Sequence, residues 1–267
     1  MKKTVSLDGS LTETGEAMLS AASAAVLYGR GVFTTVAVRN GEPLNWEKHE
    51  RRLARDAARV GLGAEISDIY RAEVSLRELL DADGLREGKA RVSLLDASVP
   101  ARWGGSPLTG VAVLVQLNTV APMPPPRLTF SPYPVNEASP LTGVKSCNYL
   151  EALLAFDEAR KRGFDEAVRI NASGIVTSGC LSSIFWKSRA TGRLHTPGLA
   201  TGCLAGTTRE LLIETVGAEE VEAGLEEFRS DAACVYLTSA ARGVAAAHSL
   251  EGMEGFDPPE SGITSVA

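Results

Sequence analysis

A run of prolines near the middle of this chain constrains its fold more than any other stretch. Residues 118–126 include Ala121-Pro122-Met123-Pro124-Pro125-Pro126, in which the last three residues are all proline. Proline donates no backbone N–H and has a fixed φ, so this run cannot lie inside a helix or a central strand. It is expected to form a stiff, extended connection. We therefore predict a linker over residues 120–127, between a smaller domain of residues 1–119 and a larger domain of residues 128–267.

The residues before the linker combine strand and helix patterns. Runs rich in β-branched or apolar residues are separated by amphipathic runs with a period near 3.6. Asn40-Gly41 predicts a tight hairpin because both residues accept positive φ. Asn45 is placed to cap the helix that follows it. The expected elements are strands at 32–39, 90–95 and 111–117 and helices at 46–60 and 66–81. This order predicts an α+β domain.

The residues after the linker give a second mixed pattern. Short apolar runs bounded by glycine, serine and asparagine alternate with two amphipathic stretches. The expected elements are strands at 127–132, 166–171, 175–177, 184–187, 193–197 and 233–237 and helices at 149–162 and 208–216. The whole chain is therefore predicted to be a two-domain α+β or α/β protein.

Composition narrows the class of function. The 267 residues carry a net charge of −6, which argues against binding to nucleic acid or to an anionic membrane surface. There is no apolar run long enough to span a bilayer, and the N-terminal lysines are not followed by the apolar segment of a signal peptide. The four cysteines form no Cys-x-x-Cys pair, so we expect no metal site. These features predict a cytoplasmic protein whose partner is a small molecule.

Lys145 is the side chain best placed for covalent chemistry. It follows a turn-rich segment, residues 139–143, and precedes the helical run that begins at Tyr149. A lysine held at such a junction, partly desolvated and near the positive end of a helix, loses some of its preference for a proton. It then becomes a usable amine nucleophile. The alternative interpretation is a surface lysine in a loop.

A second feature is the loop Gly202 to Arg209, which opens the helix expected at residue 208. Glycine allows close backbone approach, and hydroxyls and free N–H groups at a helix start can bind a phosphate. The alternative is a helix capped by Thr207. Arg52 likewise has two interpretations, an anion ligand or part of a solvated helix face, and the three histidines are expected to be structural. We call the loop Gly202 to Arg209 the phosphate cup. A lysine nucleophile together with such a phosphate-binding loop is what a pyridoxal phosphate enzyme requires.

The chain resembles the class IV, or fold-type IV, pyridoxal phosphate enzymes, which include branched-chain and D-amino-acid aminotransferases and aminodeoxychorismate lyase. The likeness runs from about Tyr28 to Val244, with short motifs in the order of that family. The matching stretches are Tyr28-Gly29-Arg30-Gly31-Val32-Phe33, His49-Glu50-Arg51-Arg52-Leu53, Lys145-Ser146-Cys147-Asn148-Tyr149-Leu150, residues 158–167, Gly206-Thr207-Thr208-Arg209 and Leu237-Thr238-Ser239-Ala240.

This resemblance implies a fold with a smaller N-terminal α/β domain and a larger C-terminal domain containing a mixed sheet or barrel. It implies pyridoxal 5'-phosphate as cofactor, a homodimer, and Lys145 as the catalytic lysine that holds the cofactor and moves protons. The cofactor-binding residues would be Arg52, Lys145, Tyr149, Ser178, Gly206, Thr207, Thr208, Ser239 and Ala240. The residues that contact the substrate would be Tyr28, Arg30, Thr35 and Arg242.

The departures from the family pattern bear on activity. Ser178 stands where the family usually has a glutamate that pairs with the ring nitrogen, and Arg30 replaces a usual aspartate. Without that carboxylate the ring is a poorer acceptor of electrons. The stretch Phe33-Thr34-Thr35 resembles the lyases more than the aminotransferases. The first expectation is therefore 4-amino-4-deoxychorismate lyase of folate biosynthesis. The alternatives are a branched-chain or D-amino-acid aminotransferase, or a diverged protein of this fold with little turnover.

Overall fold

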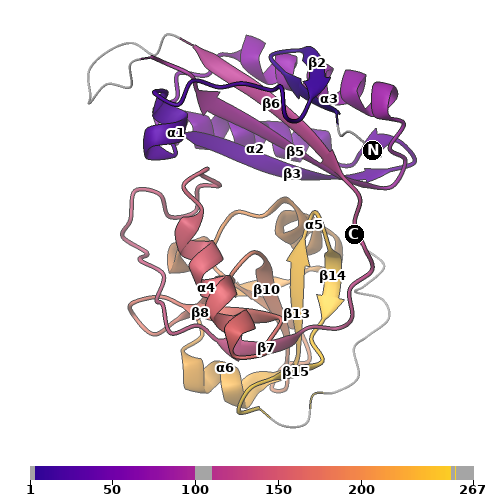
Figure 1. Cartoon of the computed structure of the whole chain (residues 1–267). Helices are drawn as coiled ribbons and strands as arrows, with labels where there is room; N and C mark the ends of the chain where they lie inside the picture. The colour runs from indigo at the N-terminus through magenta and orange to yellow at the C-terminus, as the bar shows by residue number, and fades with distance from the viewer. Residues whose placement is uncertain (1–3, 100–109, 254–255, 257–267) are drawn as a thin grey trace. The chain divides into compact units, whose positions relative to one another are not determined.

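The computed structural model describes residues 4–99, 110–253 and 256 and divides the chain into two compact units (Figure 1). The first unit comprises Met1–Ala121 and Val144–Tyr149, and the second comprises Pro122–Gly143 and Leu150–Ala267. The chain thus leaves the first unit at the proline run and later returns to it for one short segment. The sequence-based division assigned Lys145 to the second domain, whereas the structure places this residue in the first unit.

The first unit is built on one sheet with strand order β2-β1-β6-β5-β3-β4. Its strands are β1 (Thr4–Leu7), β2 (Ser10–Glu13), β3 (Gly31–Arg39), β4 (Glu42–Pro43), β5 (Gly88–Asp96) and β6 (Val111–Asn118). Its helices are α1 (Ala24–Tyr28), α2 (Trp46–Arg59) and α3 (Ile66–Asp83). All the ladders of this sheet are antiparallel.

Strand β3 shows why this unit has two different faces. Val32, Val36 and Val38 are fully buried and belong to the core that contains Leu53 of α2 and Leu76 of α3. Side chains alternate across a strand, so Phe33 and Thr35 belong to the opposite face of the sheet, whereas Thr34 shares the face of the valines. Figure 1 shows α2 and α3 covering one face of this sheet. The opposite face is left for the side chains discussed below.

The turns of the first unit test two sequence predictions. Asn40 and Gly41 both have positive φ and join β3 to β4, which confirms the hairpin. Asn45 is the N-cap residue of α2, as predicted, but its backbone is left-handed and its side chain makes no capping bond. The β1–β2 hairpin was missed, although Asp8 and Gly9 are the same kind of turn signal and both have positive φ.

The second unit contains two sheets, with strand orders β12-β11-β10-β13-β14 and β15-β7-β8-β9. The strands are β7 (Arg127–Phe130), β8 (Glu166–Ile170), β9 (Val176–Gly179), β10 (Ser183–Ser188), β11 (Leu194–Pro197), β12 (Glu219–Val221), β13 (Ala232–Ser239), β14 (Gly243–Ala246) and β15 (Ser249–Leu250). The helices are α4 (Leu150–Lys161), α5 (Thr207–Val216) and α6 (Leu225–Asp231), with a 3-10 turn at Leu199–Thr201. Both parallel and antiparallel pairs occur, so the unit is mixed, as expected.

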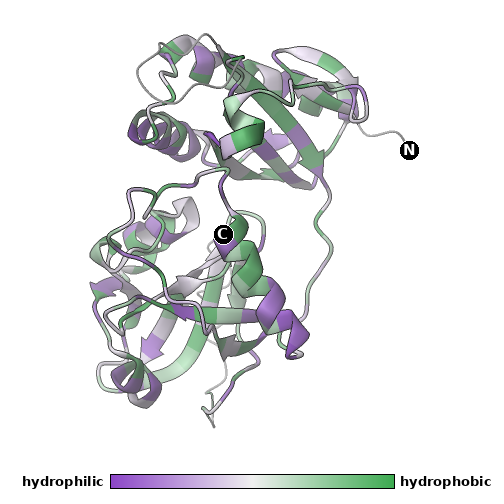
Figure 2. Ribbon diagram, turned by 60° about the vertical axis from the view of Figure 1, so that its left-hand side comes forward, coloured by the Kyte–Doolittle hydropathy of each residue, from purple (hydrophilic) through white to green (hydrophobic). Residues whose placement is uncertain are grey.

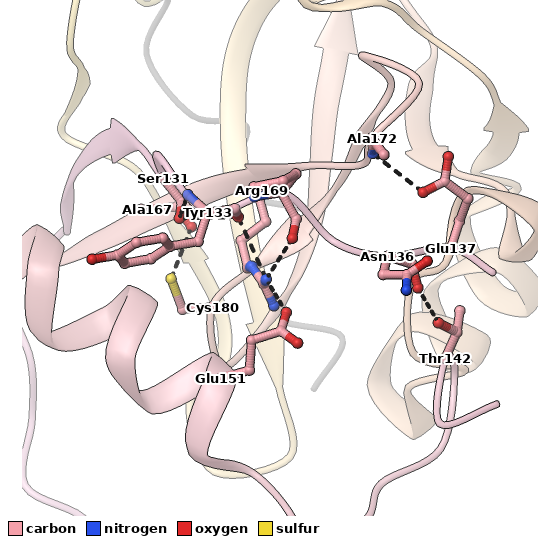
Figure 3. A network of polar contacts seen from close by, with 11 residues as sticks. Ser131, Tyr133, Asn136, Glu137, Thr142, Glu151, Ala167, Arg169, Ala172 and Cys180 are labelled. Atoms are coloured by element: carbon pink, nitrogen blue, oxygen red, sulfur yellow. Dashed lines mark hydrogen bonds and ion pairs between the residues drawn. The ribbon is translucent and has the colours of Figure 1, made fainter. Parts of the chain in front are cut away.

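A polar network centred on Arg169 fixes α4 and the segment before it (Figure 3). The guanidinium of Arg169, on β8, donates to Glu151 of α4 at 2.5 Å and lies 3.5 Å from the carbonyl oxygens of Tyr133 and Pro134. The hydroxyl of Thr142 donates to the carbonyl of Asn136 at 2.6 Å. These bonds hold the loop from which the chain returns to the first unit.

The exposed surface of α4 is unusually apolar at its start. Leu150, Leu153 and Leu154 share one side of the helix by spacing and are each more than 40% exposed. Figure 2 shows apolar colouring over the N-terminal half of α4 and hydrophilic colouring over its C-terminal half. Within the described residues, no helix combines the length and apolar character needed to cross a bilayer.

Candidate active site

The segment that carries Lys145 is held against the start of β3 by backbone hydrogen bonds. The amide of Phe33 donates to the carbonyl of Lys145, and the amide of Cys147 donates to the carbonyl of Gly31, both at 2.9 Å. The backbone amide of Lys145 itself donates to the Oδ2 atom of Asp56 at 2.9 Å. The lysine backbone is therefore fixed on both sides, which leaves motion only to its side chain.

The Lys145 amine lies over two aromatic rings. Its Nζ atom is 4.5 Å from the ring centroid of Phe33 and 4.9 Å from that of Tyr149. The two rings meet edge to face at 5.2 Å. Nζ also lies 3.5 Å from the hydroxyl oxygen of Tyr149. This arrangement gives the amine an apolar wall and one polar neighbour that can exchange a proton with it.

The pKa of Lys145 is lowered to about 7, mainly by burial and in addition by the positive charges of Arg52 and Arg91, while Asp56 acts in the opposite direction. The lowered pKa that the sequence suggested is thus present, and desolvation, one of its two predicted causes, is the largest contribution. The other predicted cause, a helix end, is not among the contributions: helix α4 begins only at Leu150, and the rest of the effect comes from the two guanidinium groups. About half of an amine with this pKa is unprotonated, and therefore nucleophilic, at neutral pH.

Arg52 is buried, so the interpretation as a solvated helix face was wrong. It lies on α2 with only 6% of its surface exposed, on the same buried side as His49 and Asp56. Its Nη2 atom donates to the hydroxyl of Thr34 at 2.5 Å, and that hydroxyl lies 2.6 Å from Nδ1 of His49. Burial, with the charges of Arg52 and Lys145, lowers the pKa of His49 to about 3, so its imidazole is neutral.

Arg91 is a charged neighbour that sequence reasoning missed. It lies on β5 directly opposite Thr35 of β3, and its guanidinium carbon is 3.6 Å from the ring centroid of Phe33. The signal available was the alternation along residues 88–96, which separates Arg91 from the apolar residues beside it. That alternation does not reveal the register between β3 and β5, which brings Arg91 to the row of Thr35.

Three further predicted residues of the first unit have different surroundings. Tyr28 is the last residue of α1 and is half exposed. Thr35 is half-buried on β3, beside Arg91 in the sheet. The guanidinium of Arg30 donates to the carbonyl of Gly61 at 2.8 Å and lies 3.6 Å from the carboxylate of Asp96. Arg30 therefore already has a carboxylate partner within its own unit.

The first turn of α5 carries the predicted phosphate cup in the second unit. Gly206 is the N-cap residue, and no side chain caps the helix, so Thr207 is the first helical residue rather than the cap. The Cβ of a larger residue at Gly206 would lie 2.9 Å from the hydroxyl of Ser183. Thr207 is buried and Thr208 is half-buried. The first N–H groups of a helix have no partners within it, so this turn can bind an anion.

The turn that joins β13 to β14 contains the other predicted donors. Ser239 pairs with Gly243 across this turn, and the amide of Arg242 donates to both the carbonyl and the hydroxyl of Ser239, at 3.1 and 3.2 Å. Ala240 is at the bend and is half-buried. The guanidinium of Arg242 lies 3.6 Å from the buried carboxylate of Glu166.

Ser178 lies on β9, opposite Arg169 of β8, and is half-buried. The buried carboxylate of Glu166, on the neighbouring strand β8, accepts from the amide of Leu181 at 2.9 Å and from the hydroxyl of Ser182 at 2.7 Å. Burial raises the pKa of Glu166. Glu166 is therefore a structural carboxylate bonded to the loop after β9, and Ser178 itself contributes no charge.

Comparison with known proteins places these motifs in a family. Residues 31–250 match the model of the class IV amino-transferases. The chain is 28% identical over 214 residues to the aminodeoxychorismate lyase of Bacillus subtilis, an alignment that covers 78% of this chain and 72% of that protein. It is 24% identical over 274 residues to a bifunctional aminodeoxychorismate lyase and D-amino acid transaminase of Mycobacterium tuberculosis, covering 93% and 91% of the two chains.

A solved structure supports the same relationship. The branched-chain aminotransferase of the thermophilic archaeon Thermoproteus uzoniensis, crystallised with norvaline, superposes with a TM-score of 0.84 at 27% identity. The superposition covers 99% of this chain and 92% of that one. The family model spans most of the sequence, including Lys145, Arg52 and the start of α5. The chain belongs to the class IV amino-transferase family.

Proposed function

We propose that this chain is a pyridoxal phosphate enzyme that eliminates pyruvate from 4-amino-4-deoxychorismate and leaves p-aminobenzoate. The observation that carries the proposal is the amine of Lys145, with a pKa near 7 and its Nζ atom over the rings of Phe33 and Tyr149. A lysine in such surroundings is costly to keep charged. Its unprotonated form is the nucleophile that covalent chemistry with an aldehyde requires.

The residues present fit the cofactor. When bound, pyridoxal phosphate supplies an aldehyde that takes up an amine and a ring that accepts electrons from a breaking bond. The chain offers the amine of Lys145 for the aldehyde. Among the residues that the family resemblance assigns to the phosphate, Arg52 lies in the first unit, and the first turn of α5 and the turn at Ser239 and Ala240 lie in the second. At Gly206 the backbone is open to close approach because no Cβ is present.

Lys145 and Tyr149 would carry out the proton transfers of the reaction. The amine is close to its pKa at neutral pH, so it can accept a proton and return it without a large free-energy cost. The Tyr149 hydroxyl, 3.5 Å from Nζ, is within reach of a small adjustment that would let it donate to or accept from this amine. The fixed backbone of Lys145 confines that exchange to one place. We assign proton transfer to Lys145 and a supporting role to Tyr149.

The lyase is favoured over an aminotransferase by the residues that differ from the family pattern. Ser178 provides a hydroxyl where a glutamate would stabilise a protonated ring nitrogen, so the ring would be a weaker electron acceptor. Transamination uses the ring as electron acceptor in both of its half-reactions, so it depends more on how strongly the ring accepts electrons. The stretch from Phe33 to Thr35 supports the same choice, and one relative is named aminodeoxychorismate lyase.

An aminotransferase is the second candidate. A branched-chain aminotransferase superposes on nearly the whole chain, and a relative in Mycobacterium tuberculosis is named for both activities. A third candidate, a diverged protein that binds the cofactor with little turnover, is favoured by Ser178 alone. In that case Ser178→Glu would create an activity that the natural protein lacks.

The deciding experiment uses purified protein loaded with pyridoxal phosphate. We expect p-aminobenzoate and pyruvate to form from 4-amino-4-deoxychorismate, and Lys145→Ala to abolish both. Formation of keto acids from branched-chain or D-amino acids, with no p-aminobenzoate, would instead identify an aminotransferase. A protein that acquires the cofactor absorption band but turns over neither substrate class would support the binding protein.

The same proposal includes the cellular setting. A cytoplasmic enzyme of folate biosynthesis agrees with an acidic chain of ordinary composition. We further propose a homodimer, supported by the exposed leucines of α4, because a stripe of this kind on a helix is typical of an interface. The domain organisation remains as proposed from the sequence, except that the segment carrying Lys145 belongs to the first unit.

A further inference from the structure

Two polar side chains in the first unit are fully buried and have no assigned role. Thr34 is 0% exposed on β3, and His49 is 2% exposed on α2. The Thr34 hydroxyl oxygen lies 2.6 Å from Nδ1 of His49, and the same oxygen accepts a hydrogen bond from Nη2 of Arg52 at 2.5 Å. Burying polar groups is costly unless they are hydrogen-bonded. Both side chains are hydrogen-bonded in one chain that ends at the Arg52 guanidinium, so their role is to be sought at Arg52.

The hydrogen positions follow from the donors available. A guanidinium only donates, so the contact from Arg52 uses a lone pair of the Thr34 oxygen. The single hydrogen of that hydroxyl is then available for Nδ1 of His49. Nδ1 accepts it only when the imidazole is neutral and carries its proton on Nε2. Burial and the charges of Arg52 and Lys145 oppose protonation of this ring, so one of its two nitrogens is an acceptor, and we take this nitrogen to be Nδ1.

We propose that Thr34 and His49 are positioning residues: the chain His49–Thr34–Arg52 fixes the Arg52 guanidinium in the orientation in which it binds the phosphate of the cofactor. This inference rests on the proposed function, which makes Arg52 a phosphate ligand. An arginine side chain has many rotamers and loses affinity for an anion when it must be ordered on binding. A hydroxyl oriented by a neutral imidazole removes that freedom in advance, and both residues act only through Arg52.

The test compares two ligands that differ only in the phosphate, pyridoxal 5'-phosphate and pyridoxal. Affinities of the apoprotein for each are measured from the absorption band formed on binding. Thr34→Val keeps the branched shape but removes the hydroxyl, and Thr34→Ser keeps the hydroxyl. We expect Thr34→Val to lower the affinity for pyridoxal phosphate by tenfold or more and the affinity for pyridoxal by less than twofold. Thr34→Ser should bind both like the natural protein.

A second pair of variants tests the imidazole. His49→Asn keeps an acceptor close to the place of Nδ1, and His49→Phe removes it. We expect His49→Phe to reproduce the selective loss of Thr34→Val and His49→Asn to restore most of the affinity for the phosphate ligand. At saturating cofactor, KM for the amino substrate should stay within twofold in all four variants. A purely structural role would weaken both ligands together, and that result would overturn the proposal.

Arg52→Gln, which removes the charge, separates this inference from the proposed function. If Arg52→Gln leaves the preference for the phosphorylated ligand intact, Arg52 is not a phosphate ligand and its assignment in the proposed function fails. If Arg52→Gln removes the preference while Thr34→Val and His49→Phe keep it, only the positioning role fails. Nitrogen-15 NMR of the natural apoprotein gives a readout that needs no variant. We expect an unprotonated Nδ1 and a protonated Nε2 at His49, and the opposite tautomer would overturn the proposal.

Discussion

The carboxylate of Asp56 accepts a hydrogen bond from the backbone amide of Lys145, with 2.9 Å between N and Oδ2. Asp56 is 1% exposed on α2, and its other oxygen accepts from the side chain of Arg55. The bond joins the helix to a segment that lies far away in the sequence. It fixes the lysine through its backbone, and the carboxylate charge also favours the protonated amine.

Replacing Asp56 should separate these two effects. Asp56→Ala leaves a buried amide without an acceptor, and we expect a loss of about 1–3 kcal/mol in the free energy of unfolding. Asp56→Asn can keep an acceptor oxygen but loses the charge, so it should be less destabilising while lowering the pKa of Lys145 further. Urea unfolding measures the first effect, and the pH dependence of Lys145 labelling measures the second. An unchanged labelling profile in Asp56→Asn would contradict the electrostatic part.

Lys145 should react with amine reagents at lower pH than the other lysines. With its pKa lowered to about 7, the rate of acylation in the apoprotein should rise between pH 6 and 8 and then level off. An ordinary lysine continues to gain reactivity up to about pH 10. Peptide mapping after brief labelling at several pH values gives the profile for each lysine. The amine of a free N-acetyl-lysine amide in the same reagent provides the comparison, and a Lys145 profile identical to it would refute the shift.

The lowered pKa of Lys145 also predicts how the free energy of unfolding changes with pH. Between pH 7 and about 10 the unfolded chain holds a proton on Lys145 that the folded chain has released, so the unfolded state binds more protons and stability rises with pH. Lys145→Met removes this dependence. We expect Lys145→Met to be more stable than the natural protein by the largest margin at or below pH 7, with the margin shrinking towards pH 10. Unfolding in urea at pH 6.5 and 9.5 measures both margins.

Arg91 should control the pKa of Lys145 by its charge. Arg91→Gln removes a positive charge that disfavours the protonated amine, so the labelling midpoint should move upward. Arg91→Lys keeps the charge and serves as the control, with a midpoint close to that of the natural protein. Equal upward shifts in both variants would indicate that packing of the guanidinium on Phe33, 3.6 Å from its centroid, matters rather than the charge.

A methyl group at Gly206 should be tolerated only if Ser183 becomes smaller. The added Cβ would lie 2.9 Å from the Ser183 hydroxyl, while the backbone of Gly206, at φ −71°, is suitable for alanine. We expect Gly206→Ala to cost about 1–3 kcal/mol in unfolding free energy through overpacking and to weaken phosphate binding. Adding Ser183→Ala should recover most of the stability. Gly198→Ala, where a Cβ meets nothing within 4 Å, is the matched control.

The exposed leucines of α4 are expected to form the interface of the proposed homodimer. Leu153→Glu combined with Leu154→Glu places charge on the apolar stripe, so we expect a dimer of the natural protein to dissociate. Ile66→Glu, on an exposed position of α3, should leave the dimer intact. Sedimentation velocity distinguishes the species. A double variant that remains dimeric would show that this stripe is not the interface.

The elements predicted from the sequence are those with strong local patterns. The strand ending at Arg39 and the hairpin at Asn40-Gly41 follow from β-branched residues and from backbone conformations available to few residue types. The start of α5 follows from glycine and threonine before an apolar run. The β1 strand was missed because it is short and gains its stability from pairing with β6, which is distant in the sequence. Such pairing leaves little trace in any single window.

The sequence by itself determined the chemical groups of the candidate site: Lys145 and Arg52 were identified from their motifs, and Ser178 from the absence of a carboxylate. The tertiary structure decided what those groups experience. Lys145 owes its lowered pKa to burial and to the charges of Arg52 and Arg91, rather than to a helix end. Those partners come from separate elements, α2 and β5. Electrostatic and desolvation effects depend on distances across the fold, and only the packing of α2 and β3 with the returning segment fixes these distances.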